Sequence, residues 1–278
     1  MDGHFRAFSF VDRITSVQPG VQIRGHYQIP AGISEFPLAL VAEAVGQLAA
    51  WSAMAKLDFK RRPVAGIANS VELLSPVRPG QTLELAADIE EVDFDAVAYC
   101  GTAHCGGIPV VRLNHCVGPM LPQEDFDDAQ AVKNRFELLC NSGATPGGFG
   151  GVPPLALEQT GCETGKWIRA NLQIPATADL FADHFARRPV FPGTLFMHKV
   201  LELAAGVAGG IPANGGKWIA RTVSDGKMRA FIPPGDLLEF EARLTKHEGD
   251  SAVVAIEARK GKRVTGTSRV ALALEKKS

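Results

Sequence analysis

The stretch PLALVAEAVGQLAAWSAMA, residues 37–55, decides how the rest of this sequence is interpreted. It is apolar on nearly every side and carries a single charge, Glu43, so it predicts a helix buried within a globular protein. Its length would also span a bilayer, but Glu43, Gln47 and Ser52 make the segment costly in lipid. Pro37 suits a helix start, because its missing N–H is not needed in the first turn. We therefore expect a central, buried helix here.

A second copy of this pattern lies further along the chain. Pro192 opens another apolar helix, 155 residues after Pro37, and the tripeptide QIP at residues 28–30 recurs at residues 173–175, 145 residues later. The second copy has therefore gained ten residues between the tripeptide and the proline, and this insertion contains His184. An internal repeat of this length predicts two units of the same fold.

Both helices are followed by segments with β-branched residues and partial alternation, which is typical of strands. The predicted strands are residues 82–89, 96–103, 110–117, 237–244, 252–258 and 264–274. One long helix with a run of antiparallel strands is an α+β unit. We predict unit 1 over residues 1–120, which contributes Glu43, and unit 2 over residues 155–278, which contributes His184.

Residues 121–154 are predicted to link the two units. This segment has an acidic start, a short helix ending near Cys140 and a Gly/Pro-rich run. It is long enough to let unit 2 swing round and pair with unit 1. We therefore expect an internal pseudo-dimer, which could assemble further into a homo-oligomer.

The composition excludes several classes of protein. The chain has 278 residues, of which 46% are hydrophobic, and its 29 Lys and Arg against 30 Asp and Glu leave a net charge of -1. No basic surplus is present to bind nucleic acid or an anionic membrane. The first residues lack a basic start followed by a long apolar run, so we expect no signal peptide and a cytoplasmic location. The five cysteines have no CxxC spacing, which favours reduced thiols and no metal site.

Two ionisable residues stand out by their context. Glu43 has no charge near it in the sequence, so it must be hydrogen-bonded, paired with a group from the other copy, or used as an acid. His184 lies just before the second helix, and a loop histidine taken alone is more often a surface or hydrogen-bonded residue than a catalyst.

Residues 183–193, DHFARRPVFPG, resemble the HFxxxPVxPG signature of the β-hydroxyacyl-acyl-carrier-protein dehydratases of fatty-acid synthesis, a hot-dog-fold family. Residues 8–14 with Pro19-Gly20 are similar to the amino-terminal strand of that family, and residues 37–47, PLALVAEAVGQ, resemble its PGVLIxEAxxQ motif. The resemblance implies a double hot dog, in which each antiparallel sheet is wrapped around a central helix. It also implies that no cofactor is needed.

The two copies depart from that family in a complementary way. In the family a histidine precedes a helical acid by fourteen positions, and the two face each other across a dimer. Here His198 stands fourteen residues after His184, and Ile29 stands fourteen residues before Glu43. One copy has kept the histidine and the other has kept the acid. We therefore predict one asymmetric active site, built from His184 and Glu43, and an inactive second pseudo-site.

The resemblance implies dehydration of 3-hydroxyacyl thioesters, carried by acyl-carrier protein or coenzyme A, to trans-2-enoyl thioesters. His184 is the predicted base for the C2 proton, and Glu43 the acid for the departing C3 hydroxyl. Apolar surroundings keep the proton of such an acid available. Gln47, one turn after Glu43, would orient the carboxyl group. The N–H of Gly193, at the start of the helix, would stabilise charge on the thioester oxygen.

Several alternatives stay open at this stage. Asp179, five residues before His184, resembles the Asp-x4-His pair of R-specific enoyl-CoA hydratases, although the Asn-Pro of that family is absent. The chain could also be a non-catalytic acyl-binding partner, or a hot-dog thioesterase that releases free acid and thiol. Two basic clusters are present, a run at residues 60–62 and a pair at residues 187–188. Each could dock an acidic carrier protein or belong to the solvated surface.

Overall fold

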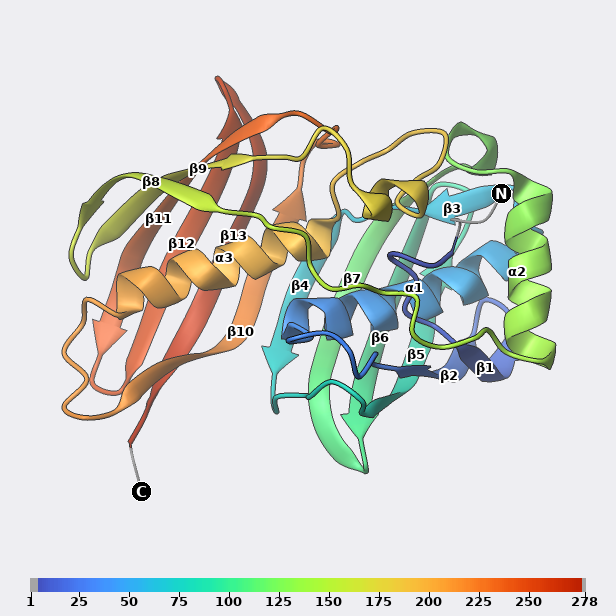
Figure 1. The fold of residues 1–278 in the computed structure, drawn as a ribbon, viewed down its shortest axis with the longest axis horizontal. Helices are drawn as coiled ribbons and strands as arrows, with labels where there is room; N and C mark the ends of the chain where they lie inside the picture. Colours follow the sequence, from blue (N-terminus) through green and yellow to red (C-terminus); the bar gives the residue numbers. More distant parts are fainter. Residues whose placement is uncertain (1–4, 277–278) are drawn as a thin grey trace.

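The strands of this protein form one continuous antiparallel sheet (Figure 1). The computed structural model describes residues 5–276. The order of the strands across the sheet is β1-β2-β5-β6-β7-β4-β10-β13-β12-β11-β9-β8, and β3 pairs with β7 beside this path. The first six strands in this order come from unit 1 and the last six from unit 2.

The elements of each part follow one another in a repeated pattern. Unit 1 contains β1 (Arg13–Gln18), β2 (Gln22–Gln28), α1 (Leu38–Lys56), β3 (Arg61–Pro63), β4 (Ile67–Leu73), β5 (Thr82–Val92), β6 (Ala96–Cys105) and β7 (Ile108–Pro122). The linker contains the 3-10 helix η1 (Gln123–Asp125) and α2 (Ala129–Asn141). Unit 2 contains β8 (Leu157–Glu163), β9 (Trp167–Gln173), η2 (Asp179–Ala182), α3 (Gly193–Ala208), β10 (Lys217–Met228), β11 (Leu237–Glu248), β12 (Ser251–Lys260) and β13 (Arg263–Glu275).

The strand order confirms the duplication. Read from either edge of the sheet, the two halves have the same sequence of elements: β1 corresponds to β8, β2 to β9, β5 to β11, β6 to β12, β7 to β13 and β4 to β10. The halves meet where β4 pairs antiparallel with β10, with Val71 opposite Val223. The chain is thus a double hot dog whose two sheets are joined edge to edge.

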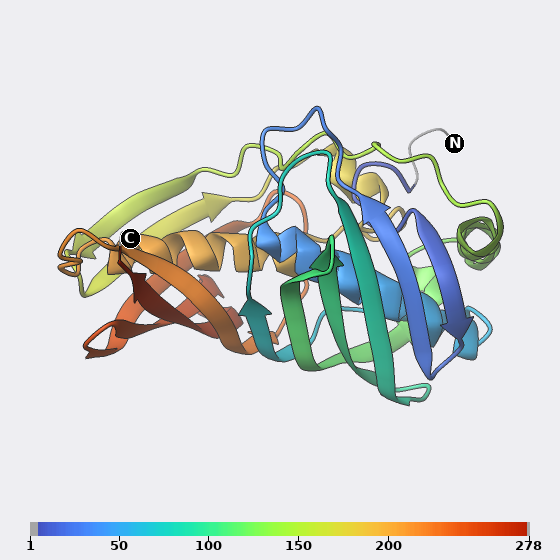
Figure 2. The same ribbon diagram turned by 90° about the horizontal axis from the view of Figure 1, so that it is seen from below.

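The two long helices lie on the same side of this sheet, each within the curve of its own half (Figure 2). Helix α1 packs on β2, β5, β6 and β7, helix α3 packs on β9 to β13, and the two helices also contact each other. Pro37 and Pro192 are the extended N-cap residues of the helices, so each helix begins one residue later than we expected. Helix α1 has the length and composition of a membrane span, but 67% of its apolar window is buried inside the protein, as is typical of a core helix.

The linker is folded against unit 1. The short helix predicted in it is present as α2, which packs on β1 at the edge of the sheet. Asp128 caps this helix by accepting a hydrogen bond from the N–H of Ala131 at 2.8 Å. Strand β7 continues to Pro122, so the regular structure of unit 1 extends into the start of the predicted linker.

Candidate active site

His184 lies in the loop between η2 and α3, which is the insertion that only unit 2 contains. Its Nδ1 lies 2.9 Å from the carbonyl oxygen of Val190. A carbonyl only accepts hydrogen bonds, so Nδ1 carries the proton and Nε2 keeps a free lone pair. The ring packs face to face with Phe185 and edge-on against Phe8 of unit 1. The imidazole is therefore fixed in the tautomer that a general base requires.

Asp183 ties this loop to the amino-terminal segment. Its buried carboxylate accepts hydrogen bonds from the backbone N–H groups of Phe5 and Phe8, the latter at 2.7 Å. Ser9 Oγ lies 3.4 Å from the same carboxylate. A segment of unit 1 is thereby held across the histidine loop of unit 2, next to the imidazole.

Glu43 lies on α1 and is held by two donors. Gln47 Nε2 donates to Glu43 Oε1 at 3.0 Å. Gln47 is itself fixed, because its Oε1 accepts from Phe10 N at 2.8 Å and its Nε2 also donates to Phe8 O at 2.9 Å. The structure thus places Gln47 in hydrogen-bond contact with the carboxyl group, and its orienting role in catalysis stays a prediction.

The second donor comes from unit 2. Thr194 Oγ1 lies 2.6 Å from Glu43 Oε2, so the acid of one unit is hydrogen-bonded to the start of the helix of the other. A threonine hydroxyl can accept as well as donate, and this contact therefore fits both protonation states of Glu43. Thr194 is two residues after the Pro192 that ends the histidine loop, which brings His184 and Glu43 to the same place.

Both side chains line one cavity of about 270 Å³ between the units. The cavity is also lined by Gly193, Gln47 and Thr194, and its remaining walls are mainly apolar. The walls come from α1, β4, β6 and β7 of unit 1 and from α3, β10 and β13 of unit 2. Enclosed, largely apolar cavities with a few convergent polar groups are the usual form of a small-molecule site.

Electrostatics in the cavity favour a neutral imidazole. Burial lowers the pKa of His184 below its ordinary value of 6.5, and the nearby carboxylate of Glu43 acts in the opposite direction. The effect of burial is the larger of the two. Since the folded protein resists protonation of this ring, Nε2 is available as a proton acceptor at neutral pH.

Gly193 is the first residue of α3, where a backbone N–H has no partner within the helix. This N–H lies at the positive end of the helix dipole and beside the cavity. A Cβ atom at this position would lie 3.2 Å from the Cβ of Ala65 and 3.5 Å from Met228 Cγ. The lack of a side chain at this position therefore allows the two units to pack closely, whatever the role of the backbone N–H.

The sequence of unit 2 matches a dehydratase family. Residues 160–267, from β8 into β13, match the family model of the ApeI-like dehydratases. The 3-hydroxyacyl-acyl-carrier-protein dehydratase FabZ of Helicobacter pylori strain HPAG1 is 30% identical over 99 residues, which cover 31% of this chain and 59% of that protein. FabZ of Actinobacillus pleuropneumoniae serotype 5b is 28% identical over 88 residues, covering 30% and 56%. Residues 160–267 of this chain are therefore similar to the hot-dog dehydratases.

The match of this chain to its curated relatives is partial, since it spans less than two thirds of their length. Solved structures resemble the whole chain but at low identity. The acyl-CoA thioesterase II TesB2 of Mycobacterium marinum has a TM-score of 0.55 at 10% identity and covers 95% of this chain and 96% of its own. The 12:0-ACP thioesterase of Umbellularia californica has a TM-score of 0.55 at 8% identity and covers 91% and 94%. These likenesses show the double hot-dog fold.

The other candidate residues of this chain lie away from the cavity. Ile29 is fully buried and apolar, and His198 does not line the cavity. Asp179 is exposed at the start of η2, outside the cavity that His184 lines. Within residues 5–276, no group of three or more His, Cys, Asp or Glu side chains could hold a metal ion. The structure thus brings together His184 and Glu43 but not the Asp179 pair.

Three side chains of the site were not predicted from the sequence. Thr194 follows the Pro-Gly of the signature, but which residue it faces depends on how the two helices meet. Asp183 was noticed only as a neighbour of the histidine. Arg62 was predicted to belong to a basic run that either docks an acidic carrier protein or is solvated surface, yet it lines the cavity and its guanidinium lies 3.9 Å from the centre of the Phe185 ring. Its sequence context gives no signal of this position.

Replacing Thr194 with Val is expected to lower kcat for the predicted dehydration about 10-fold. The valine keeps the branched shape but removes the hydrogen bond to Glu43, and a bond to a charged group contributes about 1.5–3 kcal/mol. Steady-state kinetics on a 3-hydroxyacyl thioester measure the effect. Thr194→Ser, which keeps the hydroxyl, is the matched control and should stay close to wild type. A valine variant with wild-type kcat would show that the bridge between the units does not matter.

Asp179→Asn and His198→Gln are expected to change kcat by no more than about twofold, which is the usual range for positions outside a site. Both residues lie outside the cavity, and neither contacts His184 or Glu43 in the described part of the chain. Kinetics per folded molecule provide the measurement. A severe loss in Asp179→Asn would instead support the hydratase arrangement.

Proposed function

We propose that this protein dehydrates 3-hydroxyacyl thioesters to trans-2-enoyl thioesters at a single site between its two units. The observation that carries the proposal is the shared cavity, which is lined by a neutral histidine from unit 2 and a hydrogen-bonded carboxyl group from unit 1. Removal of water across a C2–C3 bond requires one base and one acid, and the two units supply one each.

The proposed chemistry assigns one proton to each residue. Nε2 of His184 takes a proton from C2, and the electron pair of that bond forms the C2=C3 double bond. The C3–O bond breaks as Glu43 donates its proton to the departing hydroxyl, which leaves as water. Charge that develops on the thioester oxygen is stabilised by the N–H of Gly193; a preorganised donor of this kind is worth about 3 kcal/mol. The proton on His184 returns to Glu43 before the next turnover.

Acyl thioesters are the proposed substrates because the related proteins process them. The curated relatives are named as acyl-carrier-protein dehydratases, and the apolar walls of the cavity suit an acyl chain. Both acyl-carrier protein and coenzyme A are candidate carriers, and a test of the proposal needs both.

The direct test is to incubate the protein with 3-hydroxyacyl thioesters of several chain lengths on each carrier. The expected result is a conjugated enoyl thioester, seen by its ultraviolet absorbance and by a mass loss of one water. The reverse reaction, hydration of the enoyl thioester, serves as a second readout. Release of free thiol without enoyl product would show a thioesterase. No reaction with any substrate would favour a non-catalytic acyl-binding role.

The rate of dehydration is expected to fall on the acid side with an apparent pKa below 6.5. The sign follows from burial, which lowers the pKa of His184, so the base stays unprotonated to a lower pH than an exposed histidine would. Below that pKa, kcat/KM should fall about tenfold for each pH unit. A profile of kcat/KM against pH measures it. An acid limb above 6.5 would contradict the assignment of the base.

A further inference from the structure

The loop that carries His184 has little regular structure of its own. Residues 183–190 lie between η2 and α3, and within the loop Val190 N donates to the carbonyl of His184 at 2.9 Å. Arg188 N donates to Phe185 O at 3.2 Å. Further support for this loop must come from other parts of the chain.

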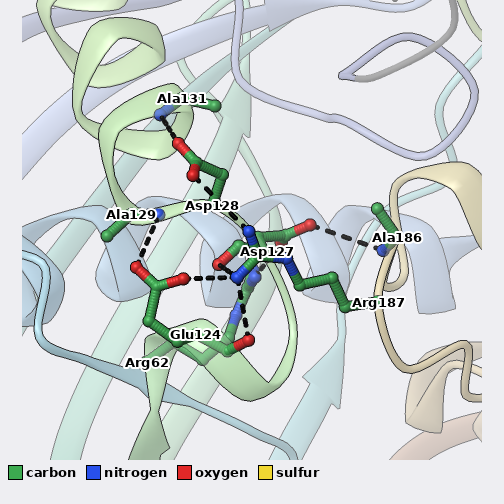
Figure 3. Close-up of polar contacts among 8 residues, drawn as sticks. All are labelled: Arg62, Glu124, Asp127, Asp128, Ala129, Ala131, Ala186 and Arg187. Carbon is green, nitrogen blue, oxygen red and sulfur yellow. Dashed lines mark hydrogen bonds and ion pairs between the residues drawn. The ribbon is translucent and has the colours of Figure 1, made fainter.

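The acidic start of the linker supplies several of these supports (Figure 3). Asp127, whose side chain is 1% exposed, forms an ion pair with Arg62 of β3. The other oxygen of this carboxylate lies 3.4 Å from the N–H of Ala186, two residues after His184. One buried carboxylate therefore joins a strand of unit 1 to the histidine loop of unit 2.

Arg62 completes this contact from the other side. Its guanidinium lies over the ring of Phe185, 3.9 Å from the ring centre, and Phe185 stacks on His184. A cation over an aromatic ring is attracted by the electrons of its face, more strongly when both groups are desolvated. The guanidinium, Phe185 and the imidazole therefore form a continuous stack beside the cavity.

Phe126 adds backbone and ring contacts next to this pair. Its carbonyl accepts a hydrogen bond from Arg187 N at 2.8 Å, and its ring packs edge-on against Phe185. Arg187 also pairs with Glu124 at the surface. The segment 124–128 thus contacts three consecutive residues of the loop, 185 to 187.

Stability alone does not account for a buried ion pair at this position. Desolvation of two charges offsets most of their attraction unless the remaining donors are satisfied, and Nε of Arg62 has no hydrogen-bond partner in the described structure. An apolar pair of similar volume would hold the linker as well. A charged pair differs from an apolar one in two respects: it fixes direction, and it sets the local electrostatic potential.

We propose that Arg62 and Asp127 are positioning residues for His184, so that the segment joining the two units is part of the active-site machinery. This inference rests on the proposed function only for its kinetic readout. Asp127 fixes the backbone of the loop at Ala186, and Arg62 fixes the stack of Phe185 on the imidazole. Neither residue is required to touch the substrate.

The pair also affects the charge on the imidazole. The ionisable groups facing His184 are Glu43 on α1, Arg62 on β3, Asp127 in the linker and the adjacent Asp183. The cation of Arg62 lowers the pKa of His184, after the larger effects of burial and of Glu43. Removing that cation should therefore raise the pKa of the base, which a purely structural contact would not do.

The kinetic test compares Arg62→Met with the double variant Arg62→Met/Asp127→Leu. Both lose the directional contacts, but the double variant leaves no unpaired buried charge and should fold. We expect kcat about tenfold below wild type in both, because small displacements of a catalytic group have effects of this size or larger. Lys133→Met is the matched control, since it removes an exposed ion pair between the linker and Asp58 of unit 1. A double variant with wild-type kcat would overturn the proposal.

A second measurement does not depend on the reaction. Titration of 13C-labelled histidine by NMR, with the His184 signal assigned from its loss in His184→Asn, gives the pKa of the ring directly. The pKa should rise in Arg62→Met, which removes only the cation, and rise less in the double variant, where loss of the Asp127 carboxylate acts in the opposite direction. It should stay unchanged in Lys133→Met. An unchanged pKa in Arg62→Met would contradict the proposal. If the wild-type protein forms no enoyl product, the proposed function fails, and this titration still tests the pair.

Discussion

Replacing His184 with Asn is expected to lower kcat for dehydration by about 10²- to 10⁴-fold while leaving the protein folded. The side-chain amide of asparagine reaches the position of Nδ1, so it can keep the hydrogen bond to the carbonyl of Val190. It has no atom at the position of Nε2, which is the proposed base. The variant thus removes one proton acceptor and little else.

The measurement is kcat on a 3-hydroxyacyl thioester together with the thermal midpoint. The thermal midpoint should stay within a few degrees of wild type, because the hydrogen bond of the loop is retained. A folded His184→Asn variant that keeps more than about a tenth of the wild-type kcat would exclude this histidine as a general base. His198→Gln is the control, since His198 occupies the position in unit 2 that Glu43 occupies in unit 1.

The duplicated fold could be predicted from the sequence because its signals are local. The apolar helices and the alternating strands after them are each visible within a short window, and all six strands predicted there are present. Strands β4 and β10, which join the units, were not predicted. Each pairs on one side with a strand of its own unit and on the other side with the matching strand of the other unit. The second pairing depends on contacts far apart in the sequence.

The same distinction applies to the site. Glu43 was recognised as a lone charge in an apolar helix, and His184 by its signature. Thr194 contacts Glu43 across 151 positions of sequence, and no local pattern indicates such a contact. Arg62 and Asp127 lie in runs of like charge that are typical of solvated surface. Each makes burial of the other possible, so neither could be placed without knowledge of the other.

The family match covers only one member of the proposed catalytic pair. The match to the ApeI-like dehydratases covers residues 160–267, which include His184 and exclude Glu43. The base therefore has a counterpart in the matched region, whereas the acid rests on the geometry of this chain. A variant of Glu43 consequently tests the part of the proposal that depends on the duplication.

Replacing Glu43 with Gln is expected to lower kcat by about 10²- to 10⁴-fold, because it removes the carboxyl group that is hydrogen-bonded to Thr194 in the shared cavity and is the proposed acid. The amide can keep both contacts: its oxygen can accept from Gln47, and its nitrogen can donate to the hydroxyl of Thr194. Stability should therefore change little. The measurement is kcat on the same thioester, with near wild-type turnover as the contradicting result.

The pairing of Glu43 with His184 is tested by combining the two variants. The double variant His184→Asn/Glu43→Gln should be about as active as the less active of the two single variants, since the effects of two residues that act as a unit are not additive. Losses that multiply would show that the two residues act independently, and a single site shared between the units would then be wrong.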